Sequence, residues 1–443
     1  MFNTENLEKK WEAVLDHADC NPIKDRYKRS TIARLLENQE LASKEQRNAL
    51  AGAGMINEDF GTSTSSVQNF DPVLISLVRR AMPNIIAYDI AGVQPLTQPT
   101  GLIFAMKTLY KSDSPDAAGV KENDEAQFFG KGDPRQNVGP DTAFSGGINE
   151  NDGTGEAITT GEAERLKGKR TESNPAGFGE MGFEIIKTSV EARSRALRAT
   201  YTTELAQDLK AVHGLDAESE LANILSTEIL SEINREVVNG VHGAAITGGF
   251  QGSGVFDLSA NSDGRWSVEK YKGLIFQIEV EANRIGKDTR RGKGNWIICS
   301  TNVASALAAA GMMEYNDVAF QHGDVDPTAG LYAGTLNGKI KVFIDPFTSD
   351  EIITIGYRGS NPYDAGVFYC PYVPLQLMRT VGEDDFQPRI GFKTRYGIRA
   401  NPFVDPVDGY GYGNAEDRFG GAGNNKYFRT FIVNSLVDFE AQG

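Results

Sequence analysis

A polar stretch between two strand-like segments constrains this chain more than any other feature of its sequence. Residues 102–107 have the character of an outgoing strand, and residues 181–190 have that of a returning strand. Between them, residues 111–180 are dominated by Gly, Asp, Asn, Glu, Lys and Pro and show almost no apolar periodicity. A loop of this length is uncommon inside a compact domain unless it serves a function. We therefore expect a long two-stranded arm with an elaborated tip, which needs a partner surface because an isolated hairpin is marginal in water.

A long helical region follows the arm. We predict helix from residue 192 to about residue 243, in two pieces separated by a glycine stop at Gly214. The second piece begins at Asp216, a residue suited to an N-cap, and ends at Gly240. Its apolar residues recur every three or four positions, at Leu221, Ile224, Leu225, Ile229, Ile233 and Val237. This piece is the longest regular element that the sequence predicts.

Helices and strands alternate after the long helix. The pattern predicts helices at 267–285 and 302–310, and strands at 294–300, 339–345, 351–357 and 366–371. This alternation indicates a mixed α/β lobe. Two more strands are predicted near 389–400 and 427–437.

The first 57 residues are predicted to be helical, with a break near Asn21-Pro22. Two apolar stripes mark the two helices, one with Leu7, Trp11, Val14 and Leu15, the other with Ile32, Leu35 and Leu36. Two interpretations stay open. The segment is either a solvated amphipathic hairpin packed on the body or a detachable arm.

Composition excludes several classes of protein. The net charge of −15 argues against a nucleic-acid groove, which needs a concentrated basic face, so we predict no sequence-specific nucleic-acid binding. The three cysteines, Cys20, Cys299 and Cys370, show no paired spacing and indicate a reducing cytoplasm. The N-terminus lacks a secretory h-region, and no stretch reaches the roughly 18 apolar residues of a membrane span.

No motif predicts catalysis. We find no metal-ligand spacing, no GxSxG elbow and no phosphate-binding loop, and we predict no catalytic residue, metal site or cofactor. Two other function classes stay open: a hydrolase with a carboxylate pair in the α/β lobe, and a glycan-binding module in residues 111–180. That polar stretch includes Phe128, Phe129 and Phe144 but no Trp or Tyr, so it is a poor platform for sugars.

A series of short motifs resembles the major capsid (head) proteins of T-even-type tailed phages, which are myoviruses. The series is Leu77-Val78-Arg79-Arg80-Ala81, Ile86-Ala87-Tyr88-Asp89-Ile90, Gly92-Val93-Gln94-Pro95 and Pro99-Thr100-Gly101. The vertex (pentamer) paralogue of the same phages shares the fold and is the alternative. The resemblance implies a structural protein of the virion, not an enzyme, which is assembled in the host cytoplasm into hexameric capsomers of an icosahedral or prolate head enclosing double-stranded DNA.

The resemblance also implies an α+β, HK97-like capsid fold with a definite order of parts. Residues 1–58 would be a helical propeptide that faces the scaffold and is removed on maturation, and 59–101 an N-arm. Residues 102–191 would be the extended loop, and 192–290 the spine helix and peripheral domain. The axial domain would occupy 291–385, and 386–443 would supply closing strands of the peripheral domain beside the spine helix.

Partners and one processing site follow from the same resemblance. The expected partners are further copies of the chain, the vertex protein, the scaffold core and prohead protease, the portal and decoration proteins. The protease of these phages cuts after Glu in an Ile/Leu-x-Glu context, which Ile56-Asn57-Glu58 matches. AGAG precedes the triplet and GTSTSSVQN follows the bond, so the chain there is suited to proteolysis. We predict cleavage between Glu58 and Asp59.

Overall fold

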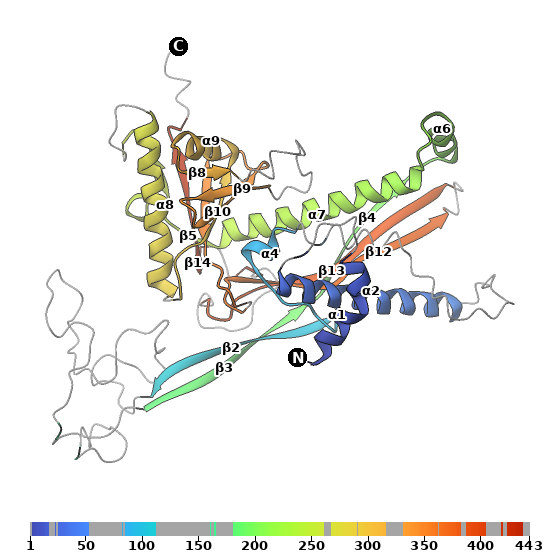
Figure 1. Ribbon diagram of the computed structural model, residues 1–443, viewed down its shortest axis with the longest axis horizontal. Helices are drawn as coiled ribbons and strands as arrows, with labels where there is room; N and C mark the ends of the chain where they lie inside the picture. The colour runs from blue at the N-terminus through green and yellow to red at the C-terminus, as the bar shows by residue number, and fades with distance from the viewer. Residues whose placement is uncertain are drawn as a thin grey trace, which may run out of the picture.

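The structure is a computed structural model that describes residues 2–16, 23, 25–52, 82, 85–111, 160, 164, 180–260, 267–289, 291–315, 331–361, 363–381, 387–404, 418–419 and 423–436. Figure 1 shows a long helix, α7 (Ala217–Ala244), that joins an α/β lobe at one end to a small helix, α6 (Thr203–His213), at the other. A two-stranded arm projects from the body below the lobe. The body thus contains both helices and sheets, as the α+β prediction requires.

The first sheet has four strands in the order β1-β12-β13-β4 and lies along α7 (Figure 1). We call it the elongated sheet. Its strands are β1 (Gly92–Val93), β12 (Val367–Val381), β13 (Pro388–Ala400) and β4 (Arg193–Thr200). Even-numbered residues of β13 from Ile390 to Ala400 are buried and odd-numbered ones from Arg389 to Arg395 are partly exposed, as expected for a strand with one covered face. Buried β13 residues Ile390, Phe392, Tyr396 and Ile398 share a core with Leu225, Ile229, Ile233 and Val237 of α7.

The second sheet forms the α/β lobe. Its main strand order is β5-β14-β11-β7-β10-β9-β8, and β6 pairs with β14. The strands are β5 (Ala245–Thr247), β6 (Val255–Asp257), β7 (Trp296–Ser300), β8 (Met313–Tyr315), β9 (Leu331–Leu336), β10 (Ile340–Asp345), β11 (Ile352–Gly356) and β14 (Asn425–Asn434). Helices α8 (Ser267–Thr289) and α9 (Thr301–Ala309) pack on it, and a short 3₁₀ turn, η2 (Phe250–Gly252), precedes β6. The predicted alternation of helices and strands is confirmed.

The arm is a regular antiparallel ribbon of β2 (Thr100–Lys111) and β3 (Glu180–Glu191). Pairing runs without a break from Thr100 opposite Glu191 to Lys111 opposite Glu180. The predicted two-stranded arm is therefore confirmed. Its tip lies outside the described residues, apart from residues 160 and 164.

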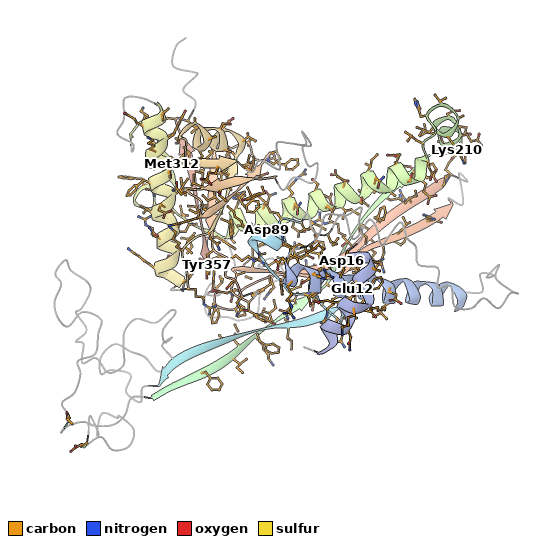
Figure 2. The ribbon with its side chains drawn as sticks, in the orientation of Figure 1. Glu12, Asp16, Asp89, Lys210, Met312 and Tyr357 are labelled. Atoms are coloured by element: carbon orange, nitrogen blue, oxygen red, sulfur yellow. The ribbon has the colours of Figure 1, made fainter. Side chains whose placement is uncertain are left out.

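Two helices at the N-terminus, α1 (Phe2–Leu15) and α2 (Arg26–Gly52), form a hairpin that packs on the body beside the short helix α4 (Ala87–Ile90). Trp11 and Leu15 of α1 and Ile32, Leu35 and Leu36 of α2 are buried in the same core as α7. Arg29 of α2 donates to both carboxylate oxygens of Asp16, at 2.8 and 2.7 Å, and Figure 2 marks Asp16 beside Glu12. The hairpin is therefore packed on the body, as the first of the two interpretations expects.

Three local predictions were wrong. Residues 193–200 form strand β4 rather than the start of a helix, because pairing with β13 outweighs the helix propensity of this Arg- and Ala-containing segment. The segment 366–371 begins β12 of the elongated sheet, not a strand of the lobe. Conversely, β14 was expected among closing strands beside the long helix, but it pairs with β11 inside the lobe. Such pairings join residues far apart in sequence, so local patterns do not specify them.

Candidate assembly surfaces

One face of the arm carries four uncovered apolar side chains. In an antiparallel ribbon, directly opposed residues share a face, and Met106 opposes Ile185 while Thr108 opposes Phe183. Leu102 and Phe104 therefore lie on the same face as Ile185 and Phe183. These four, which we call the apolar stripe, are 47%, 54%, 61% and 71% exposed in that order. A contiguous exposed apolar surface of this kind is typical of a protein–protein contact.

The other face of the arm is seated on the elongated sheet. Ile103 and Val190 are each only 2% exposed and share a small core with Leu96, Phe368 and Cys370. The chain thus buries one side of the ribbon at its base and leaves the opposite side to solvent.

Gly397 of β13 permits this seat. A Cβ atom at that position would lie 2.5 Å from Val190 Cγ1 and 2.8 Å from the carbonyl oxygen of Glu191. Any larger residue would therefore push β3 away from the sheet. The close approach also shows that the arm crosses the side of the sheet opposite α7. Sequence patterns did not single out Gly397, because only the position of β3 gives it a role.

The opposite side of the sheet is tied to α7 by charged groups. Arg195 of β4 donates to Glu232 and to Glu236 of α7, each at 2.7 Å. Glu236 also accepts hydrogen bonds from Arg418, at 2.6 Å, and from the hydroxyl of Tyr396. Burial, together with the neighbouring carboxylate of Glu236, raises the pKa of Tyr396. The helix and the sheet are thus joined by apolar packing and by paired charges.

The N-terminal hairpin protects an open strand edge. Asn38 of α2 donates to the carbonyl oxygens of Leu96 and Tyr372, at 2.8 and 2.9 Å, and Tyr27 donates to the carbonyl of Val93. Only the first part of β12 pairs with β1, so part of that β12 edge has no strand partner. An exposed strand edge invites pairing with another chain, and here α2 covers it.

Lys28 adds an ion pair to the same contact, with Nζ 3.1 Å from Asp89 Oδ1. Figure 2 shows Asp89 on α4, between the hairpin and α7.

The predicted cleavage residues Ile56, Asn57, Glu58 and Asp59 lie outside the described residues.

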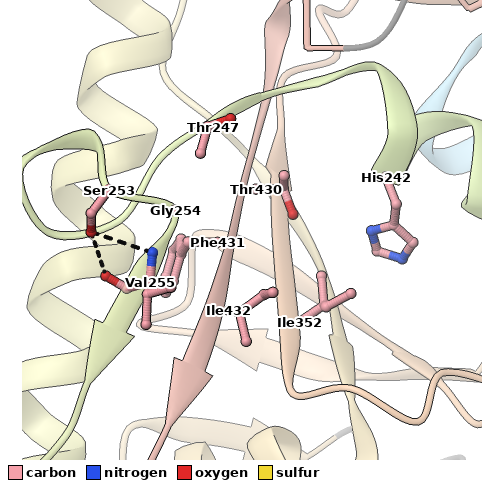
Figure 3. A pocket seen from close by; sticks show the side chains of 9 residues that line it. All are labelled: His242, Thr247, Ser253, Gly254, Val255, Ile352, Thr430, Phe431 and Ile432. Atoms are coloured by element: carbon pink, nitrogen blue, oxygen red, sulfur yellow. Dashed lines mark hydrogen bonds between the residues drawn. The ribbon is translucent and has the colours of Figure 1, made fainter.

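A small cavity of about 330 Å³ lies where α7 meets the lobe (Figure 3). His242 lines it and lies 2.5 Å through Nδ1 from the hydroxyl of Thr354, while burial lowers the pKa of this imidazole. Ser253 is placed across the cavity from His242 in Figure 3, and its hydroxyl donates to the carbonyl of Val255. These two residues therefore do not form a nucleophile–base pair, and the residues lining the cavity include no carboxylate.

The part of the chain that the structure describes gives little evidence of metal binding, thiol chemistry or a membrane-spanning helix. Within those ranges, no group of three or more His, Cys, Asp or Glu residues is placed to hold a metal ion. Cys299 and Cys370 are buried free thiols, and burial raises the pKa of each to about 12, so neither is primed as a nucleophile. Among the described helices, none is both long and apolar enough to cross a bilayer.

The similarity of this chain to known proteins shows its family. The model of the family "Major capsid protein Gp23" matches residues 67–433. The chain belongs to this family. A major capsid protein of Salmonella phage ViI is 38% identical to it over 98% of both chains, and that of Enterobacteria phage T4 is 35% identical over 96% of this chain and 98% of its own. The chain is therefore a major capsid protein of the T-even type, and its place is the virion capsid.

The vertex alternative fits less well. The capsid vertex protein of phage T4 is 27% identical and covers 54% of this chain and 57% of its own length. The major capsid relatives match nearly the whole chain at higher identity, so the prediction of a major capsid protein is confirmed.

The fold agrees with that assignment. An N-terminal segment, a two-stranded arm, a long helix and an α/β lobe follow one another in the HK97-like order that the resemblance implied. Among solved structures, the capsid of Myoviridae phage XM1 covers 79% of this chain and 92% of its own, with a TM-score of 0.40 and 7% identity. A structure from Mycobacterium phage Bobi covers 87% and 97%, with a TM-score of 0.40 and 8% identity.

Proposed function

We propose that this chain forms hexameric capsomers of a phage head that encloses double-stranded DNA, and that its arm clamps the adjacent copy. The apolar stripe is the observation that carries the proposal. Fully burying one large apolar side chain contributes roughly 1.5–3 kcal/mol, so covering four that are about half exposed contributes several kcal/mol per contact. A heterologous contact between two different surfaces repeats around a closed ring, which multiplies this modest contribution.

Within such a capsomer we assign α7 and the elongated sheet to the peripheral domain, and the eight-stranded lobe to the axial domain. Strand pairing supports placing β12 with the former and β14 with the latter. Residues 59–101 would be the N-arm and 102–191 the extended loop. A closed head also needs the vertex protein and the portal, and contacts with these, with the scaffold core and with decoration proteins belong to the same proposal.

Residues 1–58 are proposed to leave during maturation, through cleavage between Glu58 and Asp59 by the prohead protease. The hairpin of α1 and α2 is packed on the body, so cutting the chain does not by itself release it. Its departure would uncover the carbonyl groups of Leu96 and Tyr372 that Asn38 now satisfies. Proteolysis coupled to such an undocking would make the change irreversible.

The clamp is tested by placing charge on the apolar stripe. Phe183→Asp combined with Ile185→Asp should leave the thermal unfolding of the monomer unchanged while abolishing shells seen by sedimentation and electron microscopy. Phe276→Asp on α8 is a matched control, because Phe276 is 71% exposed, as is Phe183. A stripe variant that builds shells as the wild type does would contradict the clamp.

Processing is tested by the intact mass of the chain in purified heads. A chain that begins at Asp59 is expected, and Glu58→Gln should retain the N-terminal segment. Full-length chain in mature heads would refute the cleavage while leaving the shell role in place.

A further inference from the structure

The side of the elongated sheet that bears the arm also carries a set of cations. Odd-numbered residues of β13 point to this side, because Gly397 meets the arm there. Lys393 and Arg395 therefore share it, and so does Arg198 of β4, which lies opposite Gly391. We call Arg198, Lys393 and Arg395 the cationic face. Arg389 and Arg399 lie further along β13 on the same side.

The three residues of the cationic face have no anionic partner in the part of the chain that the structure describes. No ion pair to Arg198, Lys393 or Arg395 is formed there, although Arg395 stacks on the ring of Tyr372 at 5.1 Å. Their neighbours in the strand register are uncharged: Ser194, Ala196 and Gln376. Residues two apart on a strand are separated by about 7 Å, so the cationic face repels itself and favours an anionic ligand.

The other side of the same sheet shows that this fold can supply carboxylates where it needs them. Arg195 lies only three residues from Arg198 on β4 but on the side of α7, where it has two glutamates at 2.7 Å. Among the described residues no such acid pairs with the cationic face, which points to an anion supplied from elsewhere. In a chain with a net charge of −15, a cluster of cations that no described carboxylate pairs with is a specific feature.

The chain itself contains a suitable anion. Residues 112–164, which continue the arm beyond β2, hold 12 Asp and Glu residues against three Lys and Arg. Within one copy, β2 runs away from the sheet for 12 residues, roughly 36 Å at about 3.3 Å per step, and Figure 1 shows it leaving on the side away from the tips of β12 and β13. The described part of the arm therefore leads away from the cationic face of its own copy.

A ring of copies offers a way to bring the two together. Where the ring axis crosses the plane of the elongated sheet, rotation keeps the same side of every copy in the same layer. Because the arm lies on the side of the sheet that bears the cationic face, the arm of one copy enters the layer in which the cationic face of the next copy lies. We infer that the cationic face binds the acidic segment 112–164 of a neighbouring copy. This inference depends on the proposed clamp and names a second, electrostatic part of it.

A charge-swap experiment in the full-length chain tests the inference. Arg198→Glu with Lys393→Glu should lower the yield of shells by about tenfold or more, and Asp124→Lys with Glu125→Lys should do the same. The two pairs combined should restore the yield to within about threefold of the wild type, because opposite charges face each other again. Lys272→Glu with Lys287→Glu on α8 matches the change in net charge and should leave the yield unchanged. Thermal unfolding of each monomer reports separately on folding.

Three results would overturn the inference. Shells could form normally with the reversed face, or the combined variant could fail to recover although each monomer is folded. Shells could also form at wild-type yield but retain less DNA, which would make phosphate the ligand. The clamp is judged separately. If the stripe variant fails to form shells while the variant with the reversed cationic face forms them normally, only the electrostatic part is rejected.

Cysteine trapping identifies the copy that supplies the acid. Lys393→Cys and Asp124→Cys, placed in two differently tagged chains and expressed together, should form a disulfide between the chains when the purified assemblies are treated with a mild oxidant such as diamide. When both substitutions are in one chain mixed with wild type, a disulfide confined to that chain would contradict exchange between copies.

Discussion

The two sides of the elongated sheet differ in whether their cations pair with carboxylates of the same chain. On the side of α7, Arg195 forms ion pairs with Glu232 and Glu236, and the apolar residues between the sheet and the helix are buried. On the side of the arm, Arg198 and Lys393 form no ion pair with a described residue, and the arm leaves its apolar stripe exposed. The comparison teaches that the side of α7 stabilises the monomer through packing and paired charges, while the proposed contacts between copies fall on the side of the arm.

The largest effect should come from the side of α7. Phe392→Ala removes a fully buried ring from the core between β13 and α7, and we expect a loss of about 3–5 kcal/mol in the free energy of unfolding. Denaturant unfolding of the monomer measures it. Phe276→Ala, which truncates an exposed ring, is the control and should change stability by less than about 0.5 kcal/mol. Similar losses in both variants would remove the distinction between covered and uncovered rings.

The second-largest effect is expected where the arm packs on the elongated sheet. Gly397→Ala forces a methyl group against Val190 and Glu191, and we expect a cost of about 1–3 kcal/mol and faster hydrogen exchange in β3. Gly391→Ala is a matched control on the same side of the same strand, since a Cβ there meets only the carbonyl oxygen of Leu197 at an ordinary 3.6 Å. Equal protection of β3 in the two variants would show that the arm is not anchored at Gly397.

Removing a paired charge should cost less stability than truncating a ring in the core. Glu236→Gln weakens the contacts of Arg195, Arg418 and Tyr396 with α7, and we expect a loss of about 1–3 kcal/mol. Glu228→Gln, also on α7 but exposed, should cost less than about 0.5 kcal/mol. The prediction fails if both glutamates can be replaced without measurable loss.

The smallest effect on the monomer is expected at the cationic face. Lys393→Ala should change the free energy of unfolding by less than about 0.5 kcal/mol, because no described residue forms an ion pair with it. Monomer unfolding and shell yield, measured on the same preparation, should therefore separate, with only the yield falling. A loss above about 1 kcal/mol would reveal a role inside the monomer and blur the contrast between the two sides.

Several of these residues could have been found from the sequence. Cations at every second or fourth position of β13, from Arg389 to Arg399, follow the period of a strand and share a side once the strand is recognised. The exposure of Phe104 and Phe183 could not, because the pattern of the arm gives no sign of which side of the ribbon the body covers. Asn38 was likewise hidden, since a polar residue in an amphipathic helix is ordinarily solvated.

The sequence alone determined the elements that depend on near neighbours: the arm strands, α7 and the glycine stop that precedes it at Gly214, most of the alternation in the lobe, and, through its motifs, the family. Local periodicity and turn residues carry that information, because they act within a few positions of the chain. Tertiary structure decided the rest. It made residues 193–200 a strand, exchanged the expected sheets of β12 and β14, and placed the arm and the cations on one side of the sheet. Those outcomes depend on hydrogen bonds and packing between distant residues, which no local pattern encodes.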